Sequence, residues 1–173
     1  MSAAKPTTII SHWNHMIPGT SESSQNFYSA IERSIAEHNL EHTKCERVNL
    51  SEGGLLSSKR EYLQLRRKEH VFHICAAPFG NGFFISWWLG EMQSGLFDSL
   101  VRIPFLGPVL GLFRNVAKPM TYYRVDTALM FQSVTHGAVL CALDDMTNAK
   151  GIRTLSEFER KPIMRDFFAN LGA

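Results

Sequence analysis

The sequence predicts an α+β fold: an antiparallel meander of four to five strands packed against an N-terminal helix, followed by a helical C-terminal part. Residues 44–91 consist of β-branched and aromatic runs separated by short turn sequences, which is typical of a strand meander. Segments with helical spacing of apolar residues lie before and after it. With 173 residues, 45% hydrophobic and 20% charged, the chain is expected to form a single domain, 1–173.

The N-terminal segment predicts a short strand followed by a helix. Residues 7–13 read TTIISHW, and Pro18-Gly19 then mark a turn. Thr20 or Ser21 is expected to cap a helix in which Phe27, Ile31 and Ile35 recur at four-residue spacing. Together with the meander, this helix makes residues 1–91 a helix-plus-sheet unit.

The meander is predicted from alternation and from one turn. Residues 44–50 and 59–67 both favour strands, and in the second of these Leu63 and Leu65 alternate with polar residues. Asn81-Gly82 separates VFHICAA from FFISWWL, and this dipeptide favours the positive φ angles of a type I′ hairpin. We therefore expect two strands joined tightly at that point.

Residues 92–119 form an apolar connector rich in proline and glycine. Its uncharged run, 103–113, is about half the roughly 20 residues that a membrane-spanning helix needs, and prolines interrupt it. Three interpretations of residues 95–113 stay open: a buried connector against the sheet, a loop at a membrane interface, or a protein-partner surface. Flanking Arg102, Arg114 and Lys118 favour the membrane interpretation.

Residues 120–173 are expected to be helical. A long apolar helix is predicted over 126–148, beginning at Asp126 or Thr127. Ser156 and Glu159 have capping-box spacing, with Thr154 and Glu157 as a second register. A short amphipathic helix is then expected to begin at Pro162, with an apolar stripe made of Ile163, Met164, Phe167, Phe168 and Leu171.

Composition places few limits on function. The net charge of +2 and pI near 8.5 fall short of a dedicated nucleic-acid-binding protein. Three widely spaced cysteines fit reduced thiols in the cytoplasm better than a disulfide framework, and the first ten residues do not resemble a secretory signal. We expect a cytoplasmic location, with the inner membrane surface as a possible site of action.

One strand face is unusually basic. Arg60, Tyr62, Gln64, Arg66 and Lys68 are predicted to share it, spaced about 7 Å apart. It is interpreted as a solvated face paired with Glu46 or Glu52, as a binding surface for anionic lipid or a small anion, or as a nucleic-acid platform. The single tyrosine makes nucleic acid the least favoured partner, since such platforms usually offer several rings.

Arg124 is a second candidate for anion binding. It lies in the sequence Tyr122-Tyr123-Arg124-x-Asp126 at the expected start of the long helix, where backbone amides could assist in holding a carboxylate or phosphate. The alternative is structural: Asp126 caps the helix while Arg124 neutralises Glu157 or Glu159.

Candidate pocket residues are few, and no catalytic motif accompanies them. Trp87, Trp88, Tyr122 and His136 could line a pocket between the sheet and the helices. His136 is expected to be a hydrogen-bonded core residue; the alternative pairs it with a cysteine nucleophile, Cys75 or Cys141.

No metal or cofactor is expected. The histidine pairs His12/His15 and His70/His73 are three apart on predicted strands, so their side chains point to opposite faces. Gly80-Asn81-Gly82 lacks the context of a nucleotide-binding loop. The favoured function is a non-enzymatic binding or interaction module. Two alternatives are an enzyme or small-ligand receptor and a homo-oligomeric assembly protein that uses the aromatics of residues 83–89 and the C-terminal stripe.

Overall fold

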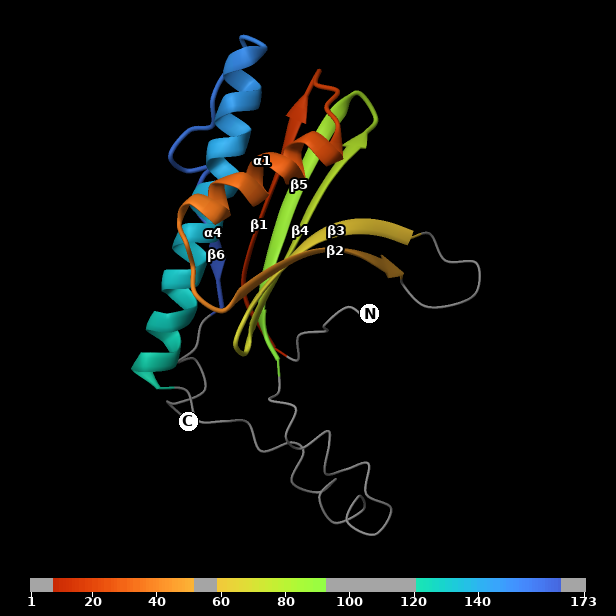
Figure 1. The fold of residues 1–173 in the computed structure, drawn as a ribbon. Helices are drawn as coiled ribbons and strands as arrows, with labels where there is room; N and C mark the ends of the chain where they lie inside the picture. Colours follow the sequence, from red (N-terminus) through yellow and green to blue (C-terminus); the bar gives the residue numbers. More distant parts are fainter. Residues whose placement is uncertain (1–7, 52–58, 93–120, 166–173) are drawn as a thin grey trace.

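A computed structural model describes residues 8–51, 59–92 and 121–165 of the chain. The described part holds an antiparallel sheet of six strands and two helices, which confirms the α+β prediction (Figure 1). The connector hypotheses for residues 95–113 lie outside the described residues, as do Phe167, Phe168 and Leu171. In chain order the elements are β1 (Thr8–Pro18), α1 (Ser24–Glu37), β2 (Thr43–Ser51), β3 (Lys59–Arg67), β4 (His70–Phe79), β5 (Gly82–Glu91), α4 (Tyr122–Ala149) and β6 (Ile163–Met164).

The strands lie in the order β2-β3-β4-β5-β1-β6. The predicted meander from β2 to β5 is therefore present, because each of these strands pairs with the next along the chain. β1 pairs with β5 along almost its whole length, with one irregularity between Ile9 and Ser11. The N-terminal strand thus extends five residues beyond its predicted end at Trp13, to Pro18.

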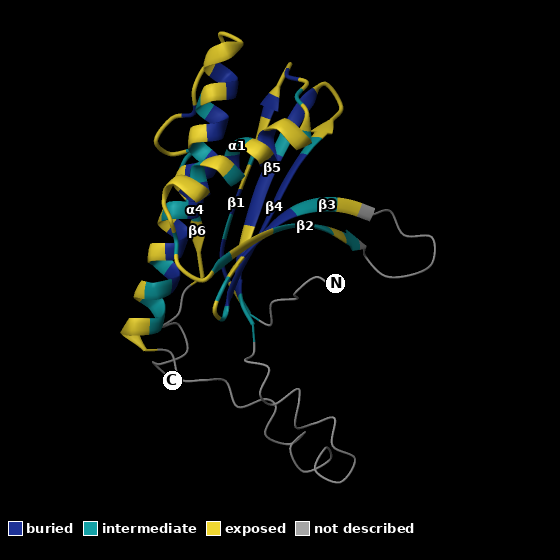
Figure 2. Cartoon of the chain, viewed as in Figure 1, coloured by how far each residue is buried: buried dark blue, intermediate teal, exposed yellow. Residues whose placement is uncertain are grey.

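Both helices pack against one face of the sheet, which we call the helix face; the opposite face is the outer face. Alternation along the strands puts Leu63 and Leu65 on the helix face and Arg60 and Arg66 on the outer face. Buried residues concentrate where the sheet meets the helices (Figure 2). On β5 the apolar helix-face residues are all fully buried: Phe83, Ile85, Trp87 and Leu89.

Helix α1 begins later than predicted and is tied to the sheet by a tyrosine. Its N-cap is Ser23, not Thr20 or Ser21, and the Ser23 hydroxyl accepts a hydrogen bond from Asn26 N–H at 3.4 Å. The Tyr28 hydroxyl accepts from Ala76 N–H at 2.9 Å and donates to the Glu61 carbonyl at 3.0 Å. This contact fixes the height of α1 over β3 and β4.

The β4–β5 hairpin is present, but its turn lies one residue earlier than predicted. Phe79 pairs with Gly82, so the two turn residues are Gly80 and Asn81. Gly80 has φ +59°, whereas Asn81 is not among the residues with positive φ. A glycine at the first turn position with positive φ is the mark of a type II′ turn rather than type I′.

The C-terminal part differs from its prediction at both ends. The long helix begins at Tyr122 after the N-cap Thr121, one turn before Asp126. The Ser156–Glu159 capping box is confirmed, since the Glu159 carboxylate accepts from Ser156 N–H at 2.8 Å and Glu159 N–H donates to the Ser156 hydroxyl at 3.4 Å. Ile163 and Met164 form strand β6 instead of a helix, because β1, on the side away from β5, offers them backbone partners.

Candidate functional site

Polar residues from neighbouring strands line up in one row across the helix face. The register pairs Thr43 with Arg67, Arg67 with His70, His70 with Glu91 and Glu91 with Thr8. Directly paired residues have Cβ atoms about 4.5–5.5 Å apart, so these side chains are neighbours. We call Thr43, Arg67, His70, Glu91 and Thr8 the inner polar row.

Arg124 brings helix α4 to this row. Its guanidinium forms an ion pair with the Glu91 carboxylate, and the two side chains are only 16% and 15% exposed. The β3–β4 turn, the end of β5 and the beginning of α4 all lie at the same end of the molecule (Figure 1). Arg124 therefore pairs with a carboxylate of the sheet, which corrects the expected pairing with Glu157 or Glu159. Glu159 instead pairs with Arg153.

Two hydrogen-bonding groups of the inner polar row are buried and have no hydrogen-bond partner in the part of the chain that the structure describes. His70, in the same row, is only 2% exposed. Arg67 Nε and Thr43 Oγ1 are buried and lack a hydrogen-bond partner within the same part of the chain. Because buried polar groups are nearly always hydrogen-bonded, two such groups on directly paired residues form an unusual cluster.

The electrostatics of the row favour a neutral His70 and an added negative charge. Burial lowers the pKa of His70; Glu69 opposes this shift, while Arg124 and Arg67 add to it. With His70 neutral, the row and Arg124 hold two guanidinium groups and one carboxylate, Glu91, and the Glu69 carboxylate acts on His70 from the β3–β4 turn. An acceptor-rich anion is the ligand that such a set of donors would bind.

The basic row predicted on β3 lies on the outer face, and its members differ in exposure. Arg60, Arg66 and Lys68 are exposed, whereas Tyr62 is half-buried and Gln64 is only 5% exposed. Gln64 Oε1 accepts from His73 Nε2 at 3.1 Å, and burial lowers the pKa of His73. The row is thus interrupted by a buried hydrogen-bonded pair, and the expectation of a uniformly solvated face is corrected.

The four pocket candidates do not line one pocket. Trp87 is fully buried, and its Nε1–H donates to His136 Nδ1 at 3.1 Å. His136 Nε2–H donates in turn to the Arg160 carbonyl at 2.6 Å, so His136 is the hydrogen-bonded core histidine that the sequence favoured. Trp88 lies on the outer face stacked on His12, with ring centroids 4.7 Å apart, and Tyr122 is 82% exposed on α4.

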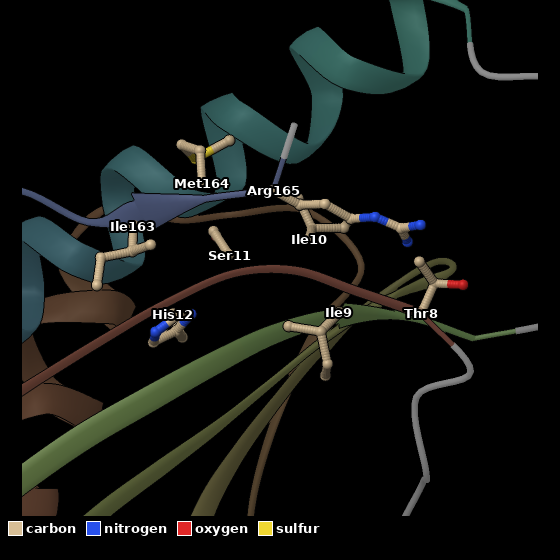
Figure 3. Close-up of a pocket in the computed structure, with 8 residues that line it drawn as sticks. All are labelled: Thr8, Ile9, Ile10, Ser11, His12, Ile163, Met164 and Arg165. Atoms are coloured by element: carbon tan, nitrogen blue, oxygen red, sulfur yellow. The ribbon is translucent and has the colours of Figure 1, made fainter. Parts of the chain in front are cut away.

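A shallow groove lies elsewhere, between β1 and β6 (Figure 3). Its volume is about 430 Å³, and its lining is mainly apolar. The exposed cation Arg165 is at one end of it (Figure 3). None of the predicted site residues lines this groove.

The sequence identifies Arg124 as a site residue but not Arg67, His70 or Thr43. It considers His70 only as a metal ligand and rejects that role, because His70 and His73 are three residues apart on one strand. The shared position of Arg67, His70 and Thr43 depends on the register of two strand pairs, which no local pattern shows. The tight Arg67-Lys68-Glu69-His70 sequence is the one local signal, because a two-residue turn places its flanking residues opposite each other.

Within the described residues, no group of histidine, cysteine or acidic side chains could hold a metal ion. No described helix is both long enough and apolar enough to cross a bilayer. The cysteines Cys45, Cys75 and Cys141 are free. Comparison with protein-family models, with curated proteins and with solved structures finds no match to this chain.

Proposed function

We propose that the protein is a non-enzymatic module that binds a small anion carrying a carboxylate or phosphate group. The site is the inner polar row together with Arg124. One observation carries the proposal: Arg67 Nε and Thr43 Oγ1 are buried and lack hydrogen-bond partners among the described residues, and they lie on neighbouring strands beside the buried His70.

The energetic argument starts from these donors. A buried donor or acceptor without a partner costs about 1–3 kcal/mol. A bound carboxylate or phosphate would accept from the Thr43 hydroxyl, from Arg67 Nε–H and from a ring N–H of His70. Hydrogen bonds that involve a charged group are roughly twice as strong as neutral ones, so the anion would recover more than the lost bonds cost.

Two arginines from different elements contribute positive charge to the proposed site. Arg67 comes from the sheet, and Arg124 comes from the first turn of α4. Glu91 holds Arg124 at the row through their ion pair. An anion placed over Arg67 and His70 would lie near both guanidinium groups, with only one carboxylate of the row opposing it.

Calorimetric titration with inorganic phosphate and with acetate, and thermal unfolding in their presence, test the proposal. A ligand at tenfold excess over its Kd stabilises the folded state by about 1.4 kcal/mol. For a chain of this size that raises Tm by about 3–6 °C. Arg67→Ala should abolish the effect, whereas Arg33→Ala, which removes an exposed arginine of α1, should keep it. Equal responses in both variants would overturn the site.

The outer basic row supports a second candidate function, binding to anionic lipid at the inner membrane surface. Arg60, Arg66 and Lys68 are exposed, and none of them forms an ion pair within the described part of the chain. A polybasic surface gains about 1 kcal/mol per cation near an anionic bilayer. Flotation with phosphatidylserine vesicles at low salt tests this candidate, and Arg66→Glu with Lys68→Glu should abolish any binding.

A further inference from the structure

Strand β2 is an edge strand of the sheet that the described residues form. It is nine residues long and pairs only with β3 among the described strands. The other edge differs, because there the two-residue strand β6 pairs with β1. A long edge strand offers a row of backbone donors and acceptors to a further strand.

The outer face of β2 carries a like-charged contact next to this edge. Lys44 of β2 lies directly opposite Arg66 of β3. Both are exposed, and neither forms an ion pair with a carboxylate within the described residues. Like charges directly opposite each other are destabilising, so a carboxylate added at the edge beside Lys44 would relieve the contact.

A second copy of the same strand can supply that carboxylate. When two β2 strands pair antiparallel in one continuous sheet, the two-fold axis runs through a residue and each residue meets one on its own face. An axis through Cys45 places Lys44 opposite the partner's Glu46, and Glu46 opposite the partner's Lys44. Axes through Lys44, Glu46 or Arg47 place a charged side chain opposite its own copy.

The remaining central register is less favourable. An axis through Val48 places Glu46 opposite the partner's Leu50 and carries Lys44 beyond the end of β2. Arg47 also forms an ion pair within its own chain, because its guanidinium contacts the Glu32 carboxylate at 3.0 Å. Of the registers between Lys44 and Val48, only the one through Cys45 joins opposite charges.

We propose that the chain forms a symmetric homodimer in which two β2 strands pair antiparallel about Cys45, with two Lys44–Glu46 ion pairs across the interface. The proposal is independent of anion binding at the inner polar row. Cys45 is exposed on this edge, and the register brings its thiol opposite its own copy.

Sedimentation equilibrium of four chains tests the interface: wild type, Lys44→Glu, Glu46→Lys and the charge swap that combines both substitutions. Each single change puts like charges opposite each other, and the swap restores two opposite pairs. We expect dimers for the wild type and for the charge swap. In each single variant, the Kd of the dimer should be at least about tenfold higher than in the wild type. A wild type that is monomeric at about 200 µM, or single variants and a swap that associate like the wild type, would overturn the proposal. Circular dichroism verifies that each variant is folded.

Oxidation by diamide tests the register. Diamide accepts two electrons and two protons from a pair of thiols as the disulfide forms. Cys45 is exposed as a residue, but neighbouring protein atoms partly desolvate its thiol, and this desolvation, with Glu32 nearby, raises the pKa of Cys45 to about 11. The reaction is therefore run at about pH 8.5 to increase the thiolate. We expect a cross-linked dimer in the wild type and in Cys141→Ser, but not in Cys45→Ser. A dimer that persists in Cys45→Ser and is lost in Cys141→Ser would contradict the register, because Cys141 is the other exposed thiol within the described residues.

Discussion

His136 shows how one side chain can be held in a single protonation state. Its Nδ1 accepts from Trp87 Nε1–H, and its Nε2–H donates to the Arg160 carbonyl. A second ring proton would have to go onto Nδ1, which faces the indole N–H. Burial accordingly lowers the pKa of His136 below its ordinary value of 6.5.

Mild acid should therefore destabilise the fold through its buried histidines. Burial lowers the pKa of His15, His70, His73 and His136. The unfolded chain binds protons at these sites near pH 6.5, while the folded chain binds them only at lower pH. The free energy of unfolding should thus change little between about pH 7 and 8 and fall as pH decreases from about 6.5 to 5. Urea unfolding at pH 8, 6.5 and 5 measures it, and a stability that rises toward pH 5 would refute the assignment.

The two adjacent tryptophans provide a matched pair of substitutions. Trp87→Phe leaves His136 Nδ1 without its donor in the core, and it should destabilise the fold by about 1–3 kcal/mol. Trp88→Phe changes a residue of the outer face that is 42% exposed, and its effect should stay within about 0.5 kcal/mol. Chemical denaturation of both variants gives the comparison. Equal losses would mean that the Trp87–His136 bond contributes nothing.

At the scale of elements, the two glycines of the β4–β5 hairpin have different structural roles. Gly80 adopts φ +59° in the turn, where a side chain is strained. Gly82 lies in β5, and a Cβ there would lie 2.8 Å from the Ile17 carbonyl oxygen of β1. Gly82 is therefore required for the close approach of β5 to β1, and not for the turn.

Alanine substitutions should distinguish these roles by their effects on stability. Gly82→Ala forces two paired backbones apart and should cost about 1–3 kcal/mol. Gly80→Ala should cost about 1 kcal/mol. Gly137→Ala is the control, because Gly137 is exposed within α4 and a Cβ there would meet nothing within 4 Å, so alanine should stabilise by up to about 1 kcal/mol. Thermal unfolding ranks the three, and a neutral Gly82→Ala would contradict the close approach.

Local patterns predict elements well where the signal itself is local. Alternation of Leu63 and Leu65 with polar residues marks β3 at its observed bounds, and the spacing of Phe27, Ile31 and Ile35 marks the buried side of α1. Helix starts are less predictable, since several serines and threonines precede α1 and only Ser23 caps it. β6 could not be predicted, because its strand conformation depends on pairing with β1, about 150 residues away.

At the scale of the whole molecule, the outer basic row and the inner polar row differ in how far the sequence predicts them. The outer basic row follows from alternation within one strand, so its residues can be found from the sequence. The inner polar row needs four strand pairings and one helix contact to bring its members together. Arg124 is recognisable only because it stands beside aromatics at a helix start, and its actual partner, Glu91, lies on a different element.

The measurement that tests the anion site most directly is an NMR titration of the ¹⁵N-labelled protein with inorganic phosphate and, separately, with acetate. It follows the backbone amides together with the Nε–H signals of the arginines. The anion site predicts saturable shifts at Thr43, Arg67, His70 and Arg124, with Arg67 Nε–H moving downfield as it gains an acceptor. Shifts confined to Arg60, Arg66 and Lys68 on the outer face, or no saturable shift with either anion, would contradict it.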